Sequence, residues 1–228
     1  MDTSCNFTVD WFSKRASLWE THLGGLRGAP NVRYLEIGTF EGRSLVWVLQ
    51  NLLTDASSQA HVIDPFTGSV EHAHDKDRFG ASTLYETFQR NIAAYRDRVV
   101  VHVGQSQKLL HAHVLGDQPF NLIYVDGSHR AFDVFRDAVR AWKILAPGGV
   151  IIFDDYLWTT MAGEFQRPKL GVDLFMRLYR RHYDVLFMDY QVALVKRSTA
   201  TSQVLPEPLL FSLFYPLASW LRVTQRSS

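Results

Sequence analysis

The stretch from Tyr34 to Ser44 holds the residues of this chain whose types and spacing say most about its chemistry. An apolar run there ends at Glu36, passes into a turn with two glycines, and resumes as the helical pattern Leu45–Leu53. Glycines in such a turn let the backbone approach a bound ligand closely. A carboxylate beside the turn would repel a pyrophosphate, and no third glycine follows as in the dinucleotide fingerprint. The stretch therefore predicts a turn that holds a ligand carrying a positive charge.

Polar side chains also follow four further runs that read as strands. Asp64 ends the second run, and Gly104-Gln-Ser-Gln107 follows the third. The fourth is followed by Asp126-Gly-Ser-His129 and the fifth by Asp154-Asp155-Tyr156. Ligands of doubly wound folds bind at the carboxyl ends of the strands. Asp64 taken alone is equally well explained as a turn residue, but polar clusters after all five strands indicate a ligand site.

Three of these acids, Asp126, Asp154 and Asp155, follow neighbouring predicted strands. Carboxylates that converge repel one another unless a cation lies among them. Hard oxygen ligands suit Mg²⁺ or another divalent ion that is completed by water and substrate oxygens. The alternative reading makes Asp126 a cofactor contact and Asp154 or Asp155 a helix cap. We favour the metal site.

Short runs rich in Val and Ile alternate with amphipathic stretches through most of the chain, which predicts an open parallel sheet with helices on both faces. The predicted strands are Val32–Ile37, Ala60–Asp64, Val99–Val103, Asn121–Val125 and Val150–Asp154. The predicted helices are Ser44–Leu53, Thr83–Tyr95, Ser106–Leu115, His129–Leu145 and Leu170–His182, with Pro147-Gly148-Gly149 as the stop after the fourth. Tyr183–Tyr190 and Gln191–Arg197 leave no room for a crossover and predict an antiparallel hairpin.

The turn at Glu36 resembles motif I of the class I S-adenosylmethionine (SAM) methyltransferases, and the resemblance extends over roughly residues 30–197. It implies an α/β fold with a doubly wound, Rossmann-like sheet of seven strands, mostly parallel with one antiparallel strand. It also implies SAM as the cofactor. The residues expected to hold SAM are Glu36, Gly38, Thr39, Gly42, Ser44, Asp64, Ser106, Gln107 and Asp126.

The acids after the fourth and fifth strands resemble those of the metal-dependent small-molecule O-methyltransferases. Ile123-Tyr-Val-Asp-Gly-Ser-His129 with Phe153-Asp-Asp-Tyr156 is similar to a bacterial branch of class I methyltransferases. The sugar-methylating members carry a base two residues after the metal acid, but Ser128 stands at that place here. His129 is the nearest group that can accept a proton near neutral pH. We expect Asp126 and His129 to be catalytic, although capping of the following helix explains His129 equally well.

These features together predict a SAM-dependent O-methyltransferase that acts on a hydroxyl of a small molecule with a divalent metal. One alternative is a metal-independent O- or N-methyltransferase whose acids orient the substrate directly. Another is a SAM-fold protein that binds a partner without catalysis, although such a module needs neither the cofactor residues nor the acids. A nicotinamide dehydrogenase fits least, because the glycine spacing differs.

The amino-acid composition limits the classes of partner that this protein is expected to bind. Lys and Arg number 24 against 23 Asp and Glu, giving a formal net charge of +1 over 228 residues. No long basic tract is present, which disfavours nucleic acid as a partner. No run approaches the ~18 apolar residues that span a bilayer. The single cysteine and a start without a signal-peptide pattern lead us to expect a cytoplasmic protein.

We expect three parts along the chain: a helical lid over residues 1–30, the SAM-binding domain over 31–198, and an apolar extension over 199–228. The aromatic residues of the first part are equally consistent with ordinary packing. The apolar extension favours packing on the core or on a second subunit, hence a possible homodimer, over attachment to a membrane surface. His72 and His74 fit a solvated loop better than a second metal site, and His111 and His113 fit the surface of a helix.

Overall fold

The computed structural model describes residues 5–68, 81–110, 114–160, 163–198 and 206–218. The chain divides into two compact units, Met1–Leu109 and Leu110–Ser228. His72, His74, His111 and His113 lie outside the described residues. No helix in the described part of the chain is both long and apolar enough to span a bilayer.

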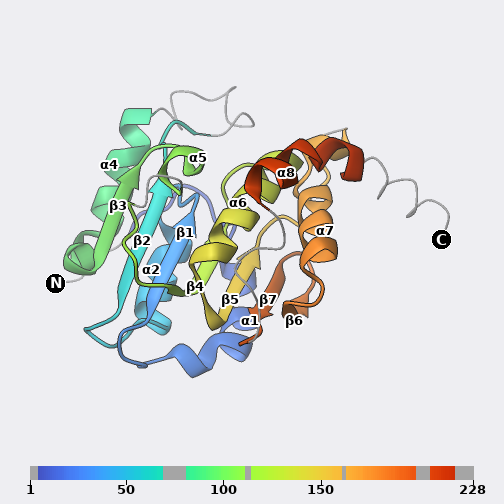
Figure 1. Ribbon diagram of the computed structural model, residues 1–228. Coiled ribbons are helices and arrows are strands. Elements are labelled where there is room, and N and C mark those ends of the chain that lie inside the picture. Colours follow the sequence, from blue (N-terminus) through green and yellow to red (C-terminus); the bar gives the residue numbers. More distant parts are fainter. Residues whose placement is uncertain (1–4, 69–80, 111–113, 161–162, 199–205, 219–228) are drawn as a thin grey trace. The chain divides into compact units, whose positions relative to one another are not determined.

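The first unit is built on three parallel strands, and β1 pairs with β2 while β2 pairs with β3 (Figure 1). Its elements are α1 (Ser13–Leu23), η1 (Gly24–Leu26), β1 (Arg33–Ile37), α2 (Arg43–Asn51), β2 (Gln59–Asp64), α4 (Ala81–Asn91), η3 (Ala93–Arg98), β3 (Val99–Val103) and α5 (Ser106–Leu109).

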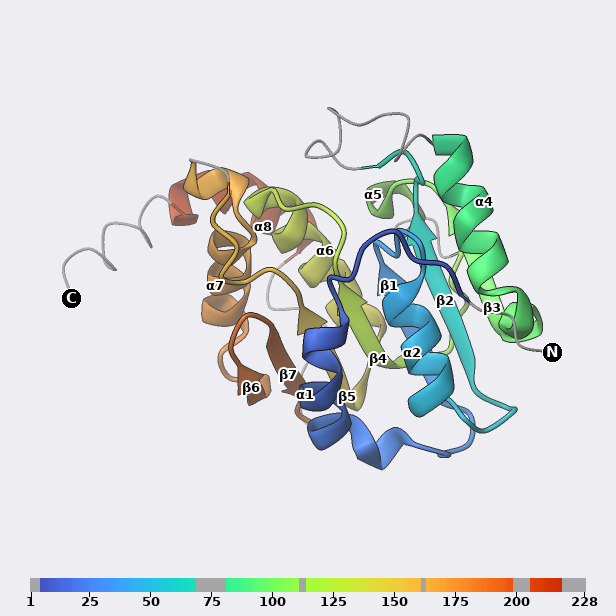
Figure 2. The ribbon, with the colours of Figure 1, turned by 180° about the vertical axis from the view of Figure 1, so that it is seen from behind.

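The apolar side chains of β1 and of α2 form the core of this unit, and Figure 2 shows α2 against the strands. Trp19 of α1 is completely buried, and its ring lies 6.1 Å from that of Trp47 on α2. The aromatic spacing of the N-terminal run therefore reflects packing onto α2. A lid role for residues 1–30 stays a prediction.

The second unit contains β4 (Phe120–Val125), α6 (Ala131–Ile144), β5 (Leu145–Phe153), η4 (Glu164–Gln166), α7 (Pro168–Tyr179), β6 (Tyr183–Met188), β7 (Val192–Lys196) and α8 (Glu207–Ser212). In Figure 1, α6 lies in front of β4 and β5 with α7 beside it. The two helices approach closely because Gly171 has no side chain. A Cβ atom there would lie 2.2 Å from the carbonyl oxygen of Ala131.

The C-terminal apolar run packs on α6 as far as it is described. Glu207 at the start of α8 pairs with Arg140 and with Lys143 of α6 at 3.3 and 2.6 Å. Phe214 is completely buried, and its ring lies 5.3 Å from that of Phe135 in a tilted arrangement. Burial of these rings removes a large apolar area from water, which accounts for the composition of the run.

The strand order is β3-β2-β1-β4-β5-β7-β6. β4 and β5 are parallel, while β7 runs antiparallel to both of its neighbours, β5 and β6. This topology confirms the predicted fold class, a class I methyltransferase sheet of seven strands that is mostly parallel with one antiparallel strand.

Two boundaries and one burial pattern differ from the sequence-based expectation. β5 begins at Leu145 and not at Val150, so Pro147-Gly148-Gly149 lies inside this strand, shortly after α6 ends at Ile144, and the ladder shifts its register between Phe120 and Leu122. The helix expected over Ser106–Leu115 is described only over Ser106–Leu109. β3 is not buried on both faces: Val103 is 58% exposed, since the strand stands at the end of the strand order.

Candidate functional site

The turn after β1 has the tight backbone that its glycines predict. Gly38 and Gly42 have φ angles of 83° and 82°, in the region that glycine adopts without strain. Phe40 between them has a φ of 50°, which is unfavourable for a bulky side chain. A Cβ atom on Gly42 would lie 3.1 Å from the ring of Phe88, so the turn is also tightly packed. Such a conformation persists only where its surroundings fix it.

Asp64, at the end of β2, fixes this turn. One carboxylate oxygen accepts the backbone N–H groups of Thr39 and Phe40 at 2.8 and 3.1 Å. The other accepts the N–H of Phe66, a second left-handed phenylalanine, at 2.6 Å. Burial raises the pKa of Asp64, and these three donors oppose the shift. The backbone N–H groups of the turn, which could otherwise bind a phosphate, are therefore already bonded to the carboxylate of Asp64. The turn thus favours a ligand that donates hydrogen bonds over one that accepts them.

Glu36 lies beneath the same turn and is completely buried. Its oxygens accept hydrogen bonds from the hydroxyls of Tyr34 and Ser44 at 2.5 and 2.6 Å. Through Ser44, the carboxylate ties the end of β1 to the first turn of α2. Burial raises the pKa of Glu36 to about 7, in spite of these donors. A direct contact of Glu36 with a bound ligand stays a prediction.

The raised pKa of Glu36 predicts a pH-dependent stability. A proton that binds more tightly in the folded state stabilises it fully below the ordinary pKa of 4.5, and this contribution is lost as pH rises toward about 7. Glu36→Gln is neutral at every pH and should avoid that loss. Urea unfolding should show the variant gaining about 2–3 kcal/mol relative to the wild type between pH 5 and pH 8. An equal difference at both pH values would contradict this, and Glu86→Gln on the surface of α4 is the matched control.

The N-terminal segment lies along the turn. The backbone N–H and the hydroxyl of Thr8 both donate to the carboxylate of Glu41 at 2.7 Å. Asp10 pairs with Arg43 at the start of α2, also at 2.7 Å. The ring of Trp11 stands 5.1 Å from that of Phe40 while 58% of the residue stays exposed. An aromatic surface is thus held next to the turn and open to solvent.

Ser106 and Gln107 occupy the first turn of α5 and are half-buried. The strand that precedes them is tied to β2 by the N–H of Gly104, which donates to the carbonyl of Asp64 at 3.0 Å. Every expected cofactor residue other than Asp126 accordingly belongs to the first unit.

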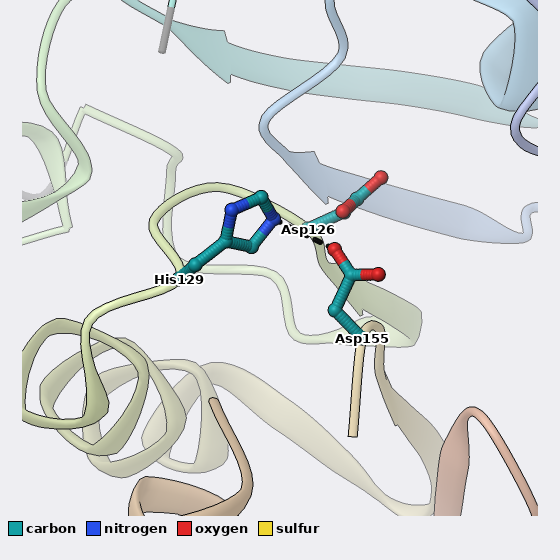
Figure 3. Close-up of side chains that lie close together, drawn as sticks. All are labelled: Asp126, His129 and Asp155. Carbon is teal, nitrogen blue, oxygen red and sulfur yellow. Dashed lines mark ion pairs between the residues drawn. The ribbon is translucent and has the colours of Figure 1, made fainter. Parts of the chain in front are cut away.

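A second group of side chains lies in the second unit, where Asp126, His129 and Asp155 each offer one ligand atom within 4.8 Å of the others. Figure 3 shows the imidazole of His129 and the carboxylate of Asp155 pointing toward each other, with Asp126 alongside. Nε2 of His129 lies 2.6 Å from a carboxylate oxygen of Asp155. All three residues are half-buried. This arrangement matches the ligand types that bind a divalent cation.

Local structure explains why His129 faces the acids. Ser128 serves the start of α6: its hydroxyl donates to Asp133 at 3.0 Å and accepts the N–H of Arg130 at 3.2 Å. His129 is turned to Asp155, and its ring stands 4.6 Å from that of Trp158. Neither residue caps the helix with its side chain: Arg130 is the N-cap of α6 and the helix has no side-chain cap hydrogen bond.

Asp154 is separated from this group. Its carboxylate accepts hydrogen bonds from the hydroxyl of Tyr124, from Nε2 of Gln191 at 3.0 Å and from the N–H of Asp155 at 2.7 Å. Burial, together with the charge of Asp155, raises the pKa of Asp154. Among the described residues, the three that gather as possible metal ligands include His129 in the place where the sequence suggested Asp154.

Sequence reasoning missed Tyr124 and Gln191, because a Tyr inside a buried strand and a Gln in a hairpin turn carry no signal of their own. Tyr156, which the sequence placed in the polar cluster after the fifth predicted strand, contacts α7. The hydroxyl of Tyr156 donates to Asp173 at 2.7 Å, and Lys169 donates to that hydroxyl and to Asp173 at 2.8 and 2.6 Å. These contacts fasten the segment after β5 to α7.

Comparison with protein families decides the class of the chain. Residues 35–156, more than half of its length, match the model of a methyltransferase domain. The chain belongs to this methyltransferase family. The matched residues include the turn after β1, Asp64, and the group Asp126, His129 and Asp155. No curated protein matches the sequence of this methyltransferase.

Solved structures share the fold at low sequence identity. The O-methyltransferase TomG from Streptomyces achromogenes, in complex with SAM, is 22% identical with a TM-score of 0.59, over 83% of this chain and 82% of that one. An O-methyltransferase from Bacillus cereus, in complex with SAH, is 21% identical with a TM-score of 0.56, over 83% and 84%. The MycE methyltransferase of mycinamycin biosynthesis, in complex with Mg and SAH, is 16% identical with a TM-score of 0.56, over 84% and 52%.

Proposed function

We propose that this methyltransferase transfers a methyl group from SAM to a hydroxyl of a small molecule and uses a divalent cation, of which Mg²⁺ is the first candidate. One observation carries the proposal: Asp126, His129 and Asp155 converge in a chain of a methyltransferase family. Two carboxylates and an imidazole within 4.8 Å of one another form a ligand set that methyl transfer to an amine would not require.

The first unit offers the chemistry that SAM requires. SAM carries a sulfonium, an ammonium group and two ribose hydroxyls, all of which favour acceptors. Carboxylates lie at the turn after β1, and the backbone N–H groups of Thr39 and Phe40 there already donate to Asp64. The turn therefore offers a ligand hydrogen-bond acceptors more than donors. The residues that would hold SAM are Glu36, Gly38, Thr39, Gly42, Ser44, Asp64, Ser106 and Gln107. TomG and the Bacillus cereus enzyme, which share the fold, hold SAM and SAH.

Replacement of Asp64 tests the cofactor. Asp64→Ala removes an acceptor for the ribose and also frees the two amides of the turn, so it should weaken SAM by roughly 1–3 kcal/mol. Calorimetric titration with SAM and SAH measures this change. Asp97→Ala, at an exposed position of η3, should bind like the wild type. Wild-type protein that binds NAD and ignores both SAM and SAH would refute the cofactor assignment.

The second unit supplies the groups that would hold the cation and the acceptor. Asp126 and Asp155 provide oxygens, and His129 provides Nε2. A bound divalent ion lowers the pKa of a coordinated hydroxyl and fixes its oxygen. The ring of Trp158 lies 4.6 Å from the imidazole of His129. MycE, which shares the fold, was solved with Mg.

Methyl transfer asks the protein mainly for alignment and for the exclusion of water. When Nε2 of His129 binds the cation, this nitrogen cannot take the proton of the acceptor hydroxyl; without a cation, the imidazole of His129 can take that proton at Nδ1 while Nε2 stays on Asp155. The 2.6 Å contact with Asp155 would stabilise the imidazolium that results. The same contact favours a second candidate, a metal-independent O-methyltransferase in which His129 is the base and Asp155 orients it.

An assay with methyl-labelled SAM tests the reaction. Purified protein is offered phenolic, catecholic, sugar and primary amine acceptors with and without Mg²⁺. Label in a hydroxyl-bearing acceptor that depends on Mg²⁺ supports the proposal, and metal-independent label in the same acceptor supports the second candidate. Label confined to amines would overturn both.

A further inference from the structure

The two adjacent acids after β5 have different surroundings. Asp155 is half-buried and faces His129, whereas Asp154 bonds inward to Tyr124 and Gln191. Gln191 is completely buried in the turn between β6 and β7, and its amide also lies 3.3 Å from the hydroxyl of Tyr124. Two residues distant in sequence thus hold one carboxylate oxygen of Asp154, and the other oxygen is left to accept the N–H of Asp155.

That last bond coincides with an unusual backbone. Asp155 has a φ of 55°, a left-handed conformation that is unfavourable for a residue with a side chain and persists only where its surroundings fix it. The neighbouring backbone is fixed on each side. The N–H of Asp154 donates to the carbonyl of Val125 at 3.0 Å, and that of Tyr156 donates to the carbonyl of Tyr190 at 2.8 Å. The amide of Asp155 itself is held by the side chain of Asp154 at 2.7 Å.

The left-handed turn decides where the carboxylate of Asp155 points. With an ordinary negative φ the side chain would leave the chain in a different direction, because φ sets the position of Cβ relative to the preceding peptide. In the conformation observed, the carboxylate meets Nε2 of His129 at 2.6 Å and stands with Asp126 (Figure 3). The amide bond made by Asp154 is therefore part of what assembles the group.

We propose that Asp154, fixed by Tyr124 and Gln191, is a positioning residue that holds Asp155 in its left-handed conformation and is not itself a ligand of the cation. The inference rests on the proposed function for the identity of the group that Asp155 serves. The two adjacent acids then have different roles: Asp155 contacts the cation, and Asp154 orients Asp155. It also assigns a role to Gln191, on the hairpin that closes the sheet.

Two substitutions of Asp154 separate positioning from ligation. Asp154→Asn keeps an oxygen that can accept the N–H of Asp155, whereas Asp154→Ala removes it. Mn²⁺ serves as the probe, and its free concentration is followed by electron paramagnetic resonance. We expect Asp155→Asn and Asp154→Ala to weaken Mn²⁺ binding by about 10-fold or more, and Asp154→Asn by less than about 5-fold. Asp184→Asn, an exposed acid on β6, removes the same charge elsewhere in the unit and is the control.

Loss of Mn²⁺ affinity in Asp154→Asn equal to that in Asp155→Asn would overturn the inference, because it would make Asp154 a ligand. A metal-free readout keeps the inference testable if the wild type binds no cation. Crystal structures without metal should show the contact between His129 and Asp155 retained in Asp154→Asn and lost in Asp154→Ala. Retention of a positive φ at Asp155 in Asp154→Ala would also overturn it.

Gln191→Leu offers an independent route if Asp154→Ala does not fold. Leucine is close in volume to glutamine, and the substitution removes the hydrogen-bond donor to Asp154 without changing Asp155. We expect it to weaken Mn²⁺ binding by about 3-fold or more while SAM binding stays within about 2-fold. Unchanged Mn²⁺ affinity in a folded Gln191→Leu protein that retains the wild-type structure elsewhere would count against the positioning role.

Discussion

Removal of divalent metal should lower turnover by at least about 10³-fold, because Lewis-acid activation of a hydroxyl lowers the barrier by several kcal/mol. Chelator treatment followed by dialysis gives the metal-free protein, and added Mg²⁺ should restore the rate. Asp155→Asn removes one of the two carboxylates that converge with His129, so it should lower the rate comparably and raise the Mg²⁺ concentration needed for half-maximal activity. The measurement is initial rate against Mg²⁺ concentration at saturating SAM.

SAM affinity should change by less than about 2-fold in the metal-free protein and in Asp155→Asn, since the expected cofactor residues other than Asp126 belong to the first unit. Asp184→Asn, which removes an exposed carboxylate of β6, should retain the wild-type rate. Full activity in excess chelator, with metal shown to be absent by elemental analysis, would reject the metal role. The pair of His129 and Asp155 would then account for the reaction.

His129→Ala should lower the rate by about 10²–10⁴-fold, the range of a general base, with SAM affinity nearly unchanged. The reason is geometric: Nε2 is the single nitrogen donor in the group and lies 2.6 Å from Asp155. Single-turnover rates with SAM in excess isolate the chemical step from product release. His22→Ala, at an exposed position of α1, is the matched control.

The two roles of His129 separate by rescue. If His129 binds the cation, high Mg²⁺ should recover part of the rate of His129→Ala; if it is a base, added imidazole should do so and Mg²⁺ should not. A fall of less than about threefold, only ~0.6 kcal/mol of barrier, would mean that neither role is significant. Loss of SAM binding in this variant would instead indicate a structural role.

Much of the fold could be predicted from local patterns. The alternation of apolar runs with amphipathic stretches identified β1, β2, β4 and β5, because strands buried on both faces are apolar throughout. The short interval between β6 and β7 predicted the antiparallel hairpin, since a parallel pair needs a crossover. The start of β5 was predicted wrongly: the strand begins at Leu145, because Leu145 pairs with Phe120 of β4 although the register shifts before Val150 pairs with Leu122.

The sequence by itself determined which residues stand at the ends of the strands. A strand, a glycine turn and an acid are local features, so Glu36, Asp64, Asp126 and the Asp-Asp pair could be found without coordinates. Local sequence patterns could not predict where these side chains point or which groups they contact. Glu36 proved to be buried beneath the turn, and the acceptors of Asp64 were already bonded to backbone amides.

Only the tertiary structure decided that Asp154 and Asp155, which are adjacent in sequence, point to different surroundings. Adjacent residues on an extended strand point to opposite sides, but Asp155 leaves the strand in a left-handed conformation whose direction no sequence pattern specifies. The partners that turn Asp154 inward, Tyr124 and Gln191, come from β4 and from the hairpin more than 60 residues apart. Such contacts form only when distant segments are packed together, because a buried carboxylate must find its hydrogen-bond donors wherever the fold places them.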